Sequence, residues 1–405
     1  MRVERIGVAG AGTMGAGIAQ VACLGGFVTH LHDPDREALA EGESRLREDL
    51  LRGGERGRWS AEAAEAASAR LRTALSLDGL AGCELVIEAA PEELELKRAL
   101  LARLAATCGP ETILVTNTSS LSVSEIAAGV ERPERVCGMH FFNPPALMRL
   151  VEVVAGKRSS EETLSAIIEV ARRMGREPVR AADAVGFIAN RCNRPFTLEA
   201  LAILGEGVAR HEEIDRAVRE RGGYRMGPFE LMDLIGIDVN LQVARSFFDQ
   251  RAESRWRPHP IQEEMVAAGR LGRKTKRGFY DYEGRAEQAA AENGSPSPAA
   301  DAQLTRLAAA PWISDLPGLI VARIVCQLVN EACFALTEGV ASAADIDTAM
   351  RLGFNHPRGP FEWAREIGPG RVLALLDALG DELGGDRYRA APGLRRWALE
   401  GSLPA

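Results

Sequence analysis

A glycine-rich turn near the N-terminus constrains the fold of this chain most strongly. The segment GVAGAGTMGAGIAQ follows the apolar run Ile6 to Ala9 and places Gly10, Gly12 and Gly15 as G-x-G-x-x-G. In a strand–turn–helix unit, the first glycine allows a tight turn, the second lets backbone approach a pyrophosphate, and the third lets helix pack on strand. The phosphates then lie at the helix N-terminus, where free N–H groups favour anions. The segment therefore predicts a dinucleotide-binding fold.

An acidic residue supports this prediction and favours one cofactor. Asp33 ends the second predicted strand, FVTHLHD, where a carboxylate accepts hydrogen bonds from the ribose hydroxyls. Its negative charge repels a 2′-phosphate, so we expect NAD rather than NADP as the cofactor. The alternative is a glycine-rich turn in some other α/β protein.

Strand and helix patterns alternate in the first part of the chain. A helical pattern covers roughly residues 35 to 73, a buried strand covers 84–90, and a helix follows over 92–108. The segments TILVTNTSS, VCGMHFFNP and LVEVVAG are three further predicted strands. This alternation predicts a doubly wound, mostly parallel sheet. We therefore expect an α/β Rossmann domain over residues 1–182.

The second part is helical and contains an internal repeat. Asp183 aligns with Asp315, and the alignment runs without a gap to Gly236 and Gly368. GPFE recurs in register, and LGEGVARHEEIDRAVR matches LTEGVASAADIDTAMR. A constant offset of this length predicts two homologous all-α domains, copy one over 183–283 and copy two over 315–405. Residues 284–314, rich in Ala, Ser, Pro and Glu, are expected to form a linker that includes a helical portion.

Composition excludes several classes of function. The net charge of −8 disfavours nucleic-acid binding, which needs a basic surface. The seven cysteines are scattered without C-x-x-C or metal-ligand spacing, so we expect reduced thiols, a cytoplasmic protein and no metal. Neither a run of 18 apolar residues nor a signal-peptide pattern is present, so we expect no membrane partner.

Three polar stretches are candidates for the active site. They are NTSSLS (117–122), MHFFNPP followed by LVEVVAG, and GFIANR (186–191). They lie at the ends of late strands or at the start of the helical part, which is where ligands bind in such sheets. Taken alone, His140 is either an acid–base group or a histidine that packs against Phe141 and Phe142.

The motifs GAGTMGAGIAQ, TNTSSLS, HFFNPP with LVEV, GFIANR and GRKTKRGFYDY, in this order, resemble the 3-hydroxyacyl-CoA dehydrogenase family. The resemblance covers residues 1 to about 283, and the second helical copy extends it to the C-terminus. Carried over by position, it implies that His140 is the catalytic base and that Glu152 orients it. It also implies that Ser119 contacts the substrate oxygen and that Asn190 lies near the thioester, with Ser120 as the alternative to Ser119.

The same resemblance implies further cofactor contacts. Glu92 and Lys97 match residues near the nicotinamide ribose and amide, and Asn117 fits a contact on the nicotinamide side. Lys274 matches a lysine that reaches the cofactor from the helical part. Without the resemblance, both lysines are better explained as surface residues.

Elementary chemistry agrees with these roles. Oxidation of a secondary alcohol needs a base for the O–H proton, and histidine suits both directions near neutral pH. A carboxylate on its other ring nitrogen fixes the tautomer, and a Ser hydroxyl or Asn amide can donate to the carbonyl that forms. Phe141 and Phe142 are expected to wall the site from water.

The repeat separates site residues from scaffold. Asn190 corresponds to Ala322 in copy two, whereas Arg323, Glu331 and GPFE persist in both copies. Asn190 is therefore dispensable for the helical fold, and the shared residues are interpreted as scaffold. Ser122 with Glu125 reads as a capping box, so the serine cluster is partly structural.

We therefore expect NAD-dependent, reversible oxidation of a short-chain (3S)-3-hydroxyacyl-CoA, with one active site per chain. Two alternatives are a dehydrogenase of a related 3-hydroxy acid or sugar acid without CoA, and a catalytically silent NAD-binding protein. The Arg52, Arg56 and Arg58 cluster either receives CoA phosphates or forms a solvated loop. In short family members two subunits pair through their helical domains, so copy two is expected to be structural and to replace that partner domain. A homodimer of the whole chain is the other expected assembly.

Overall fold

The computed structural model describes residues 2–283, 297–306 and 313–401. The chain divides into two compact units, Met1–Phe187 and Ile188–Ala405. Each unit is described by itself, and the first carries the glycine-rich turn.

The first unit is built on one eight-stranded sheet with the order β3-β2-β1-β4-β5-β6-β7-β8. Neighbouring strands are parallel except for β6 and β7, which are antiparallel. The doubly wound, mostly parallel fold is thus confirmed. The strands are β1 Arg5–Ala9, β2 Val28–His32, β3 Leu71–Ala74, β4 Leu85–Glu88, β5 Ile113–Thr116, β6 Val136–Phe141, β7 Leu150–Ala155 and β8 Glu177–Ala182.

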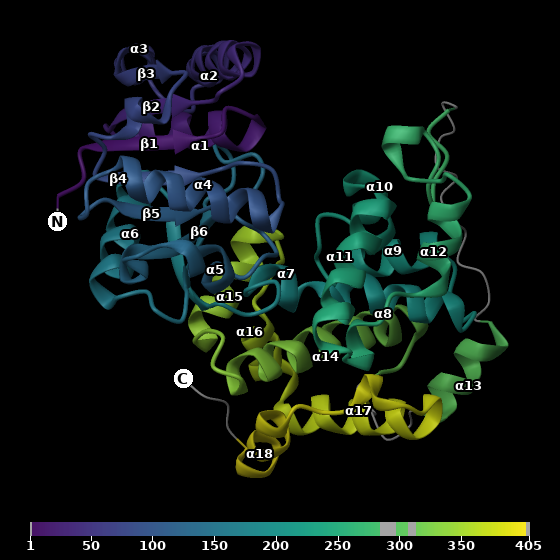
Figure 1. The fold of residues 1–405 in the computed structure, drawn as a ribbon. Coiled ribbons are helices and arrows are strands. Elements are labelled where there is room, and N and C mark those ends of the chain that lie inside the picture. The colour runs from purple at the N-terminus through teal and green to yellow at the C-terminus, as the bar shows by residue number, and fades with distance from the viewer. Residues whose placement is uncertain (1, 284–296, 307–312, 402–405) are drawn as a thin grey trace. The chain divides into compact units, whose positions relative to one another are not determined.

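Helices cover both faces of this sheet (Figure 1). One hydrophobic cluster joins the sheet to α1 Thr13–Leu24, α2 Arg36–Glu55, α3 Ala61–Arg70 and α6 Glu161–Arg173. A second cluster joins the other face to η1 Leu77–Leu80, α4 Leu94–Thr107 and α5 Val123–Ile126. Two short 3₁₀ helices, η2 Ala127–Gly129 and η3 Pro133–Arg135, lead into β6. Burial on both faces explains why the central strands are nearly continuous apolar runs.

Two strands differ from the sequence-based expectation. The helical pattern predicted over 35–73 is interrupted at Gly57, which has a φ of +67°, and its last residues form the edge strand β3. β8 lies at the opposite edge of the sheet, contains Pro178 and is only partly buried. Short edge strands with exposed residues carry a weak periodic signal, which is why neither was predicted.

The second unit is all helical and repeats its elements. Copy one has α7 Ala189–Cys192, α8 Arg194–Gly205, α9 His211–Glu220, α10 Pro228–Ile235, α11 Ile237–Arg251, η4 Ser254–Trp256, α12 Pro260–Ala267 and η5 Arg273–Thr275. Copy two has α14 Leu316–Thr337, α15 Ala343–Gly353, α16 Pro360–Ile367, α17 Pro369–Leu383, η7 Asp386–Tyr388 and α18 Pro392–Glu400. Within the predicted linker, α13 Pro298–Arg306 is helical, whereas 284–296 and 307–312 lie outside the described residues.

The recurring GPFE motif has the same local structure in both copies. The Glu230 carboxylate accepts from the Gly227 N–H at 2.9 Å, and Glu362 accepts from the Gly359 N–H at 2.7 Å. Asp215 accepts from the Phe229 N–H, as Asp347 does from the Phe361 N–H. These carboxylates satisfy the free N–H groups at the start of α10 and α16. The shared residues therefore serve the scaffold.

The two copies exchange equivalent ion pairs across their contact. Arg191 of copy one pairs with Glu331 of copy two at 2.7 Å, and Arg323 of copy two pairs with Glu199 of copy one at 2.7 Å. All four side chains are at most 2% exposed. Reciprocal contacts of this kind define an isologous interface, here formed within one chain.

In the part of the chain that the structure describes, one helix is long and apolar enough to cross a membrane by length and composition alone. It is α14, and 89% of its most apolar window is buried inside the protein. The search of the sequence for 18 consecutive apolar residues did not identify this helix, because polar residues interrupt its apolar run. Its burial identifies it as the central helix around which both copies pack.

Candidate active site

The site residues predicted in the first unit lie near the end of the sheet that holds the carboxyl termini of the parallel strands. The glycine-rich turn follows β1, Glu92 follows β4, Ser119 follows β5, and His140 lies near the end of β6. The strand order reverses between β1 and β4, and crevices at such a point bind ligands. The parallel topology, rather than proximity in sequence, therefore gathers these side chains.

The glycine turn has the geometry that a dinucleotide needs. Gly10 has a φ of +116°, and a Cβ there would lie 2.6 Å from the Ala89 carbonyl oxygen. A Cβ on Gly15 would lie 1.8 Å from the Gly10 carbonyl oxygen. Gly12 has open space around its Cα, and no side chain caps the α1 N-terminus. The N–H groups of that terminus are therefore available to a pyrophosphate, so the residues present fit NAD.

Asp33 holds the turn in place. Its carboxylate accepts from the Ala11 N–H at 2.9 Å and from the Asp35 N–H at 3.0 Å. A carboxylate offers about four acceptor positions, so capacity remains for ribose hydroxyls.

His140 and Glu152 form a direct pair. They are opposite each other in the antiparallel β6–β7 ladder, and His140 Nδ1 lies 2.6 Å from Glu152 Oε2. The two side chains are 7% and 0% exposed. With the carboxylate accepting from Nδ1–H, a neutral imidazole carries its lone pair on Nε2. The arrangement leaves Nε2 as the ring nitrogen that can take a proton from a bound hydroxyl.

The aromatic wall around His140 differs from the expected one. Phe142 contacts the imidazole, with ring centroids 4.5 Å apart, but Phe141 packs in the hydrophobic core on the other face. Successive strand residues alternate between faces, so His140 and Phe141 cannot share one side of the sheet. The second ring against His140 is Phe187, with centroids 5.8 Å apart. The expectation for Phe141 was therefore wrong. The second aromatic residue beside His140 is Phe187, which belongs to the motif GFIANR.

Glu92 organises the loop that carries Ser119 and Ser120, here called the serine loop. Its Oε1 accepts from the Thr118 hydroxyl at 2.7 Å and from the Ser119 and Ser120 N–H groups at 2.8 and 3.0 Å. Both serine hydroxyls also lie within 3.2 Å of it. Burial alone would raise the pKa of Glu92, but Lys97 and these hydrogen bonds outweigh it and hold the pKa below its ordinary value. The loop therefore has a fixed anionic anchor.

Lys97 lies beneath this anchor. The side chain is 1% exposed, and its ammonium contacts Glu88 at 2.8 Å and Glu92 at 3.4 Å. Glu88 also accepts from the Thr116 hydroxyl at 2.6 Å. Lys97 and Glu92 were predicted as site residues. Glu88 was not predicted, because it lies inside the apolar segment ELVIEAA.

Two further polar residues tie the strand ends together. Asn117 Oδ1 accepts from the Phe141 N–H at 2.8 Å, which links the ends of β5 and β6. Asp183, predicted to begin the helical part, accepts from the Ser122 hydroxyl and the Ser124 N–H, both at 2.8 Å. Of the predicted capping box, the bond from the Glu125 N–H to the Ser122 hydroxyl is present.

The remaining two predicted site residues belong to the helical unit. Asn190 lies on α7, where its carbonyl accepts from the buried Arg194 side chain at 3.3 Å. Arg194 is buried, and this desolvation lowers its pKa to about 10. Lys274 lies in η5, about half exposed, with its ammonium 2.6 Å from Asp238. Their roles stay predictions.

Comparison with known families covers nearly the whole chain. The sequence model of the 3-hydroxyacyl-CoA dehydrogenase NAD-binding domain matches residues 5–184. The model of the C-terminal domain of the same enzymes matches residues 186–282 and 318–405.

Individual relatives are similar over long stretches. A protein of Escherichia coli (strain K12) named 3-hydroxyadipyl-CoA dehydrogenase is 39% identical, over 98% of this chain and 98% of its own. A probable 3-hydroxybutyryl-CoA dehydrogenase of Bacillus subtilis (strain 168) is 40% identical, over 70% of this chain and 99% of its own. The crystal structure of 3-hydroxybutyryl-CoA dehydrogenase from Escherichia coli K12 substr. MG1655 has a TM-score of 0.91 and 37% identity, covering 99% of both chains.

Proposed function

The chain belongs to the 3-hydroxyacyl-CoA dehydrogenase family, and from this premise we propose that it oxidises (3S)-3-hydroxyacyl-CoA to 3-oxoacyl-CoA reversibly with NAD. The observation that carries the proposal is the buried His140–Glu152 pair at the edge of the sheet that also holds the dinucleotide turn. Names of relatives support acyl-CoA substrates of four and six carbons.

His140 is the proposed catalytic base. Its Nε2 takes the proton of the C3 hydroxyl while the C3 hydrogen leaves with its electron pair and the carbonyl forms. Bound NAD supplies the acceptor for that hydride. Glu152 holds the Nδ1–H tautomer and stabilises the imidazolium that results. In the reverse direction the imidazolium returns the proton to the oxygen.

The serine loop supplies the proposed donor to the substrate oxygen. The Ser119 hydroxyl can turn from Glu92 to the carbonyl that forms, and Asn190 is proposed to donate near the thioester. Gly10, Gly12, Gly15 and Asp33 are proposed to bind the pyrophosphate and ribose. Glu92 and Asn117 are proposed nicotinamide-side contacts, with Lys97 acting through Glu92 because its side chain is buried. Lys274 is proposed to reach the cofactor from the helical part.

A substrate panel tests this function. The protein is mixed with NAD and with 3-hydroxybutyryl-CoA, 3-hydroxyhexanoyl-CoA or free 3-hydroxybutyrate, and NADH is followed by absorbance. We expect NADH from the thioesters, little from the free acid, competitive inhibition by free CoA, and a preference for NAD over NADP. Oxidation of the free acid without inhibition by CoA would favour the 3-hydroxy acid alternative. NAD binding without NADH from any thioester would favour the catalytically silent alternative.

The two serines are distinguished by matched substitutions. We expect Ser119→Ala to lower kcat/KM for 3-hydroxybutyryl-CoA by about 10- to 100-fold, because a hydrogen bond to the reacting oxygen is lost. Ser120→Ala is expected to stay within about threefold, since the Ser120 N–H keeps its bond to Glu92. Steady-state kinetics at saturating NAD compare both variants. The reverse order would assign the substrate contact to Ser120.

The assembly proposal concerns the helical unit. Copy two is proposed to take the place that a partner subunit's helical domain has in shorter relatives, because the two copies meet in a reciprocal interface. The Bacillus subtilis relative is matched along 99% of its length by 70% of this chain, which leaves room for one helical copy. A cytoplasmic location is proposed because the seven cysteines are scattered singly, and a homodimer of the whole chain is the other proposed assembly. The exchanged ion pairs make this arrangement testable by mutation.

A further inference from the structure

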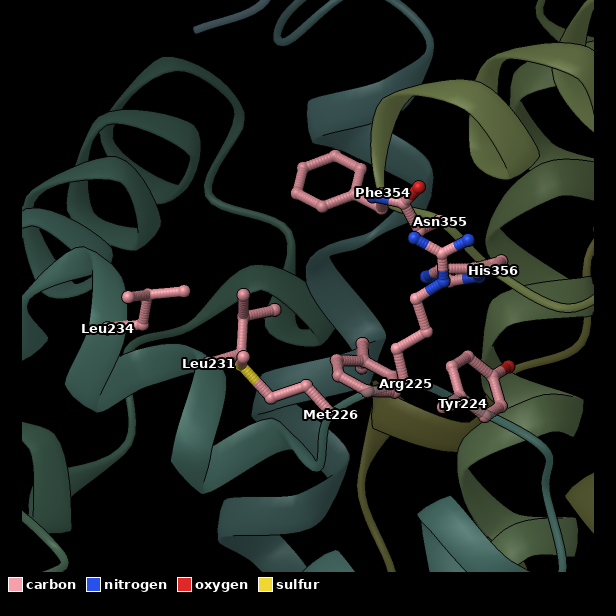
Figure 2. Close-up of a pocket in the computed structure, with 9 residues that line it drawn as sticks. Tyr224, Arg225, Met226, Leu231, Leu234, Phe354, Asn355 and His356 are labelled. Atoms are coloured by element: carbon pink, nitrogen blue, oxygen red, sulfur yellow. The ribbon is translucent and has the colours of Figure 1, made fainter. Parts of the chain in front are cut away.

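Charged side chains are distributed differently in the two units. In the helical unit, a pocket of about 210 Å³ has a largely apolar lining, and Arg225 is the ionised side chain among the described residues that line it (Figure 2). The histidine of this lining, His356, is neutral at pH 7, because burial lowers its pKa to about 3. In the first unit, by contrast, Glu88 and Glu92 lie at the carboxyl end of β4 and contact the ammonium group of Lys97. A ligand of the first unit therefore meets an anionic cluster.

This cluster carries one net negative charge. Lys97 Nζ lies 2.8 Å from Glu88 Oε1 and 3.4 Å from Glu92 Oε2. Among the residues that the structure describes, no other cation pairs with either carboxylate. The Thr116 hydroxyl and the Ala90 N–H, both at 2.6 Å, also donate to Glu88, so this buried carboxylate has donors for both oxygens. One ammonium group between two carboxylates leaves a charge of −1.

Glu92 is the exposed member of the cluster. Its side chain is 35% exposed, whereas those of Glu88 and Lys97 are at most 1% exposed. The Ser119 and Ser120 N–H groups hold its Oε1 in place. Burial alone would raise the pKa of Glu92, but Lys97 and the hydrogen bonds hold the pKa below its ordinary value, so the group is ionised at pH 7. The cluster therefore presents a fixed anion at the strand ends.

The strand order places this anion along the path of the cofactor. The glycine turn follows β1, Glu92 follows β4, and His140 lies near the end of β6, in the order β1-β4-β5-β6. Adjacent strands are about 4.8 Å apart, so these three steps span roughly 14 Å. A dinucleotide with its diphosphate at the β1 turn has to cross the ends of β4 and β5 to bring its nicotinamide to a hydroxyl at His140. The nicotinamide half therefore passes Glu92, and the adenosine half extends toward Asp33 after β2.

The reaction moves a positive charge along this path. The nicotinamide of NAD carries one positive charge, which the hydride neutralises. The hydroxyl proton goes to His140 Nε2, so the positive charge then lies on the imidazolium beside Glu152. Charges several ångströms apart at a partly buried site interact appreciably. The Glu92 side of the path thus favours the charge before the transfer, and Glu152 favours it afterwards.

We propose that the cluster of Glu88, Lys97 and Glu92 favours binding of the oxidised cofactor relative to the reduced one, and that it balances Glu152 so that the reaction runs in both directions. The inference rests on the proposed function and adds a role for two buried residues. Glu92 acts directly on the nicotinamide half. Glu88 and Lys97 act through the charges that they contribute to the cluster.

The ratio of the Kd for NAD to the Kd for NADH isolates this effect, because contacts that both forms make cancel in the ratio. Calorimetry gives the Kd for NAD and fluorescence titration gives that for NADH, both without substrate. Glu92→Gln is expected to raise the ratio by about 3- to 10-fold, since it removes one charge near the nicotinamide. Glu92→Asp keeps the charge and should leave the ratio within about twofold of the wild-type value, even where both affinities fall.

Two further variants separate charge from contact. Glu88→Gln removes the same charge from a residue that is too buried to touch a ligand, and the ratio should rise as in Glu92→Gln. Asp33→Asn removes a carboxylate on the adenosine side, which is identical in NAD and NADH. Both Kd values should then rise by a similar factor, with the ratio within about twofold of wild type. Circular dichroism checks that each variant is folded.

The outcomes distinguish this inference from the proposed function. A ratio that is unchanged or lower in Glu92→Gln would overturn the role of the cluster and leave the dehydrogenase assignment intact. A rise in Glu92→Gln that a folded Glu88→Gln does not share would contradict a charge carried by the whole cluster. A wild-type protein that bound neither NAD nor NADH would count against the proposed function itself.

Discussion

Replacing His140 by Gln is expected to lower kcat/KM for 3-hydroxybutyryl-CoA by about 10²- to 10⁴-fold, the usual range for a lost acid–base group. Glutamine has a similar reach but no ring nitrogen that can accept the hydroxyl proton. The affinity for NAD should stay unchanged, because Asp33 bonds to the glycine turn whereas His140 bonds to Glu152. Steady-state kinetics and calorimetric titration with NAD measure the two quantities separately.

Matched controls distinguish a chemical defect from a folding defect. His30→Gln changes a partly buried histidine of β2 in the same sheet and should keep kcat/KM within about threefold. Glu152→Gln should also be strongly impaired, because an amide can donate to Nδ1 and favour the wrong tautomer. If His140→Gln retained near wild-type activity, the assignment of His140 as base would be wrong.

Replacing Arg323 by Met is expected to reduce the free energy of unfolding of the helical unit by about 3–5 kcal/mol. Arg323 is fully buried, and its guanidinium bonds to Glu199 of copy one, to Glu206 and to the Tyr388 hydroxyl. These carboxylates raise the pKa of Arg323 although burial alone would lower it. The substitution leaves Glu199 buried with the partly exposed Arg387 as its remaining cation.

Urea unfolding followed by tryptophan fluorescence measures this loss. Arg395→Met breaks an exposed pair with Asp377 and should cost at most about 1 kcal/mol. Arg191→Met removes the equivalent partner of Glu331 and should resemble Arg323→Met, since the two pairs are exchanged between the copies. Stability of Arg323→Met equal to that of Arg395→Met would contradict a reciprocal interface held by buried charges.

Strong periodic signals explain why most of the fold could be predicted from the sequence. The central strands are buried on both faces and therefore are continuous apolar runs, and the repeat identifies the helical copies by their shared residues. β3 and β8 could not be predicted because an edge strand buries little and β8 contains Pro178. The exchange of Arg191 and Arg323 between copies could not be predicted either, because identical motifs do not reveal which copy supplies each partner.

The site was predictable where local geometry decides it. Two strands that follow each other closely form an antiparallel pair, and this places Glu152 opposite His140. Phe187 and the anchoring of the serine loop by Glu92 depend on loops that meet only after the sheet has formed. The burial of Lys97 was not predicted, because its partner Glu88 is a charge hidden inside an apolar segment. Resemblance named the candidate residues, and tertiary contacts show how the protein holds their side chains.

The transfer of deuterium from substrate to cofactor tests the central claim most directly. (3S)-3-Hydroxybutyryl-CoA carrying deuterium at C3 is incubated with NAD and the wild-type enzyme, and the NADH is analysed by mass spectrometry. Direct hydride transfer predicts one deuterium in each NADH formed, together with an equal amount of 3-oxobutyryl-CoA. NADH without deuterium, or the absence of NADH from an enzyme that binds NAD, would contradict the account.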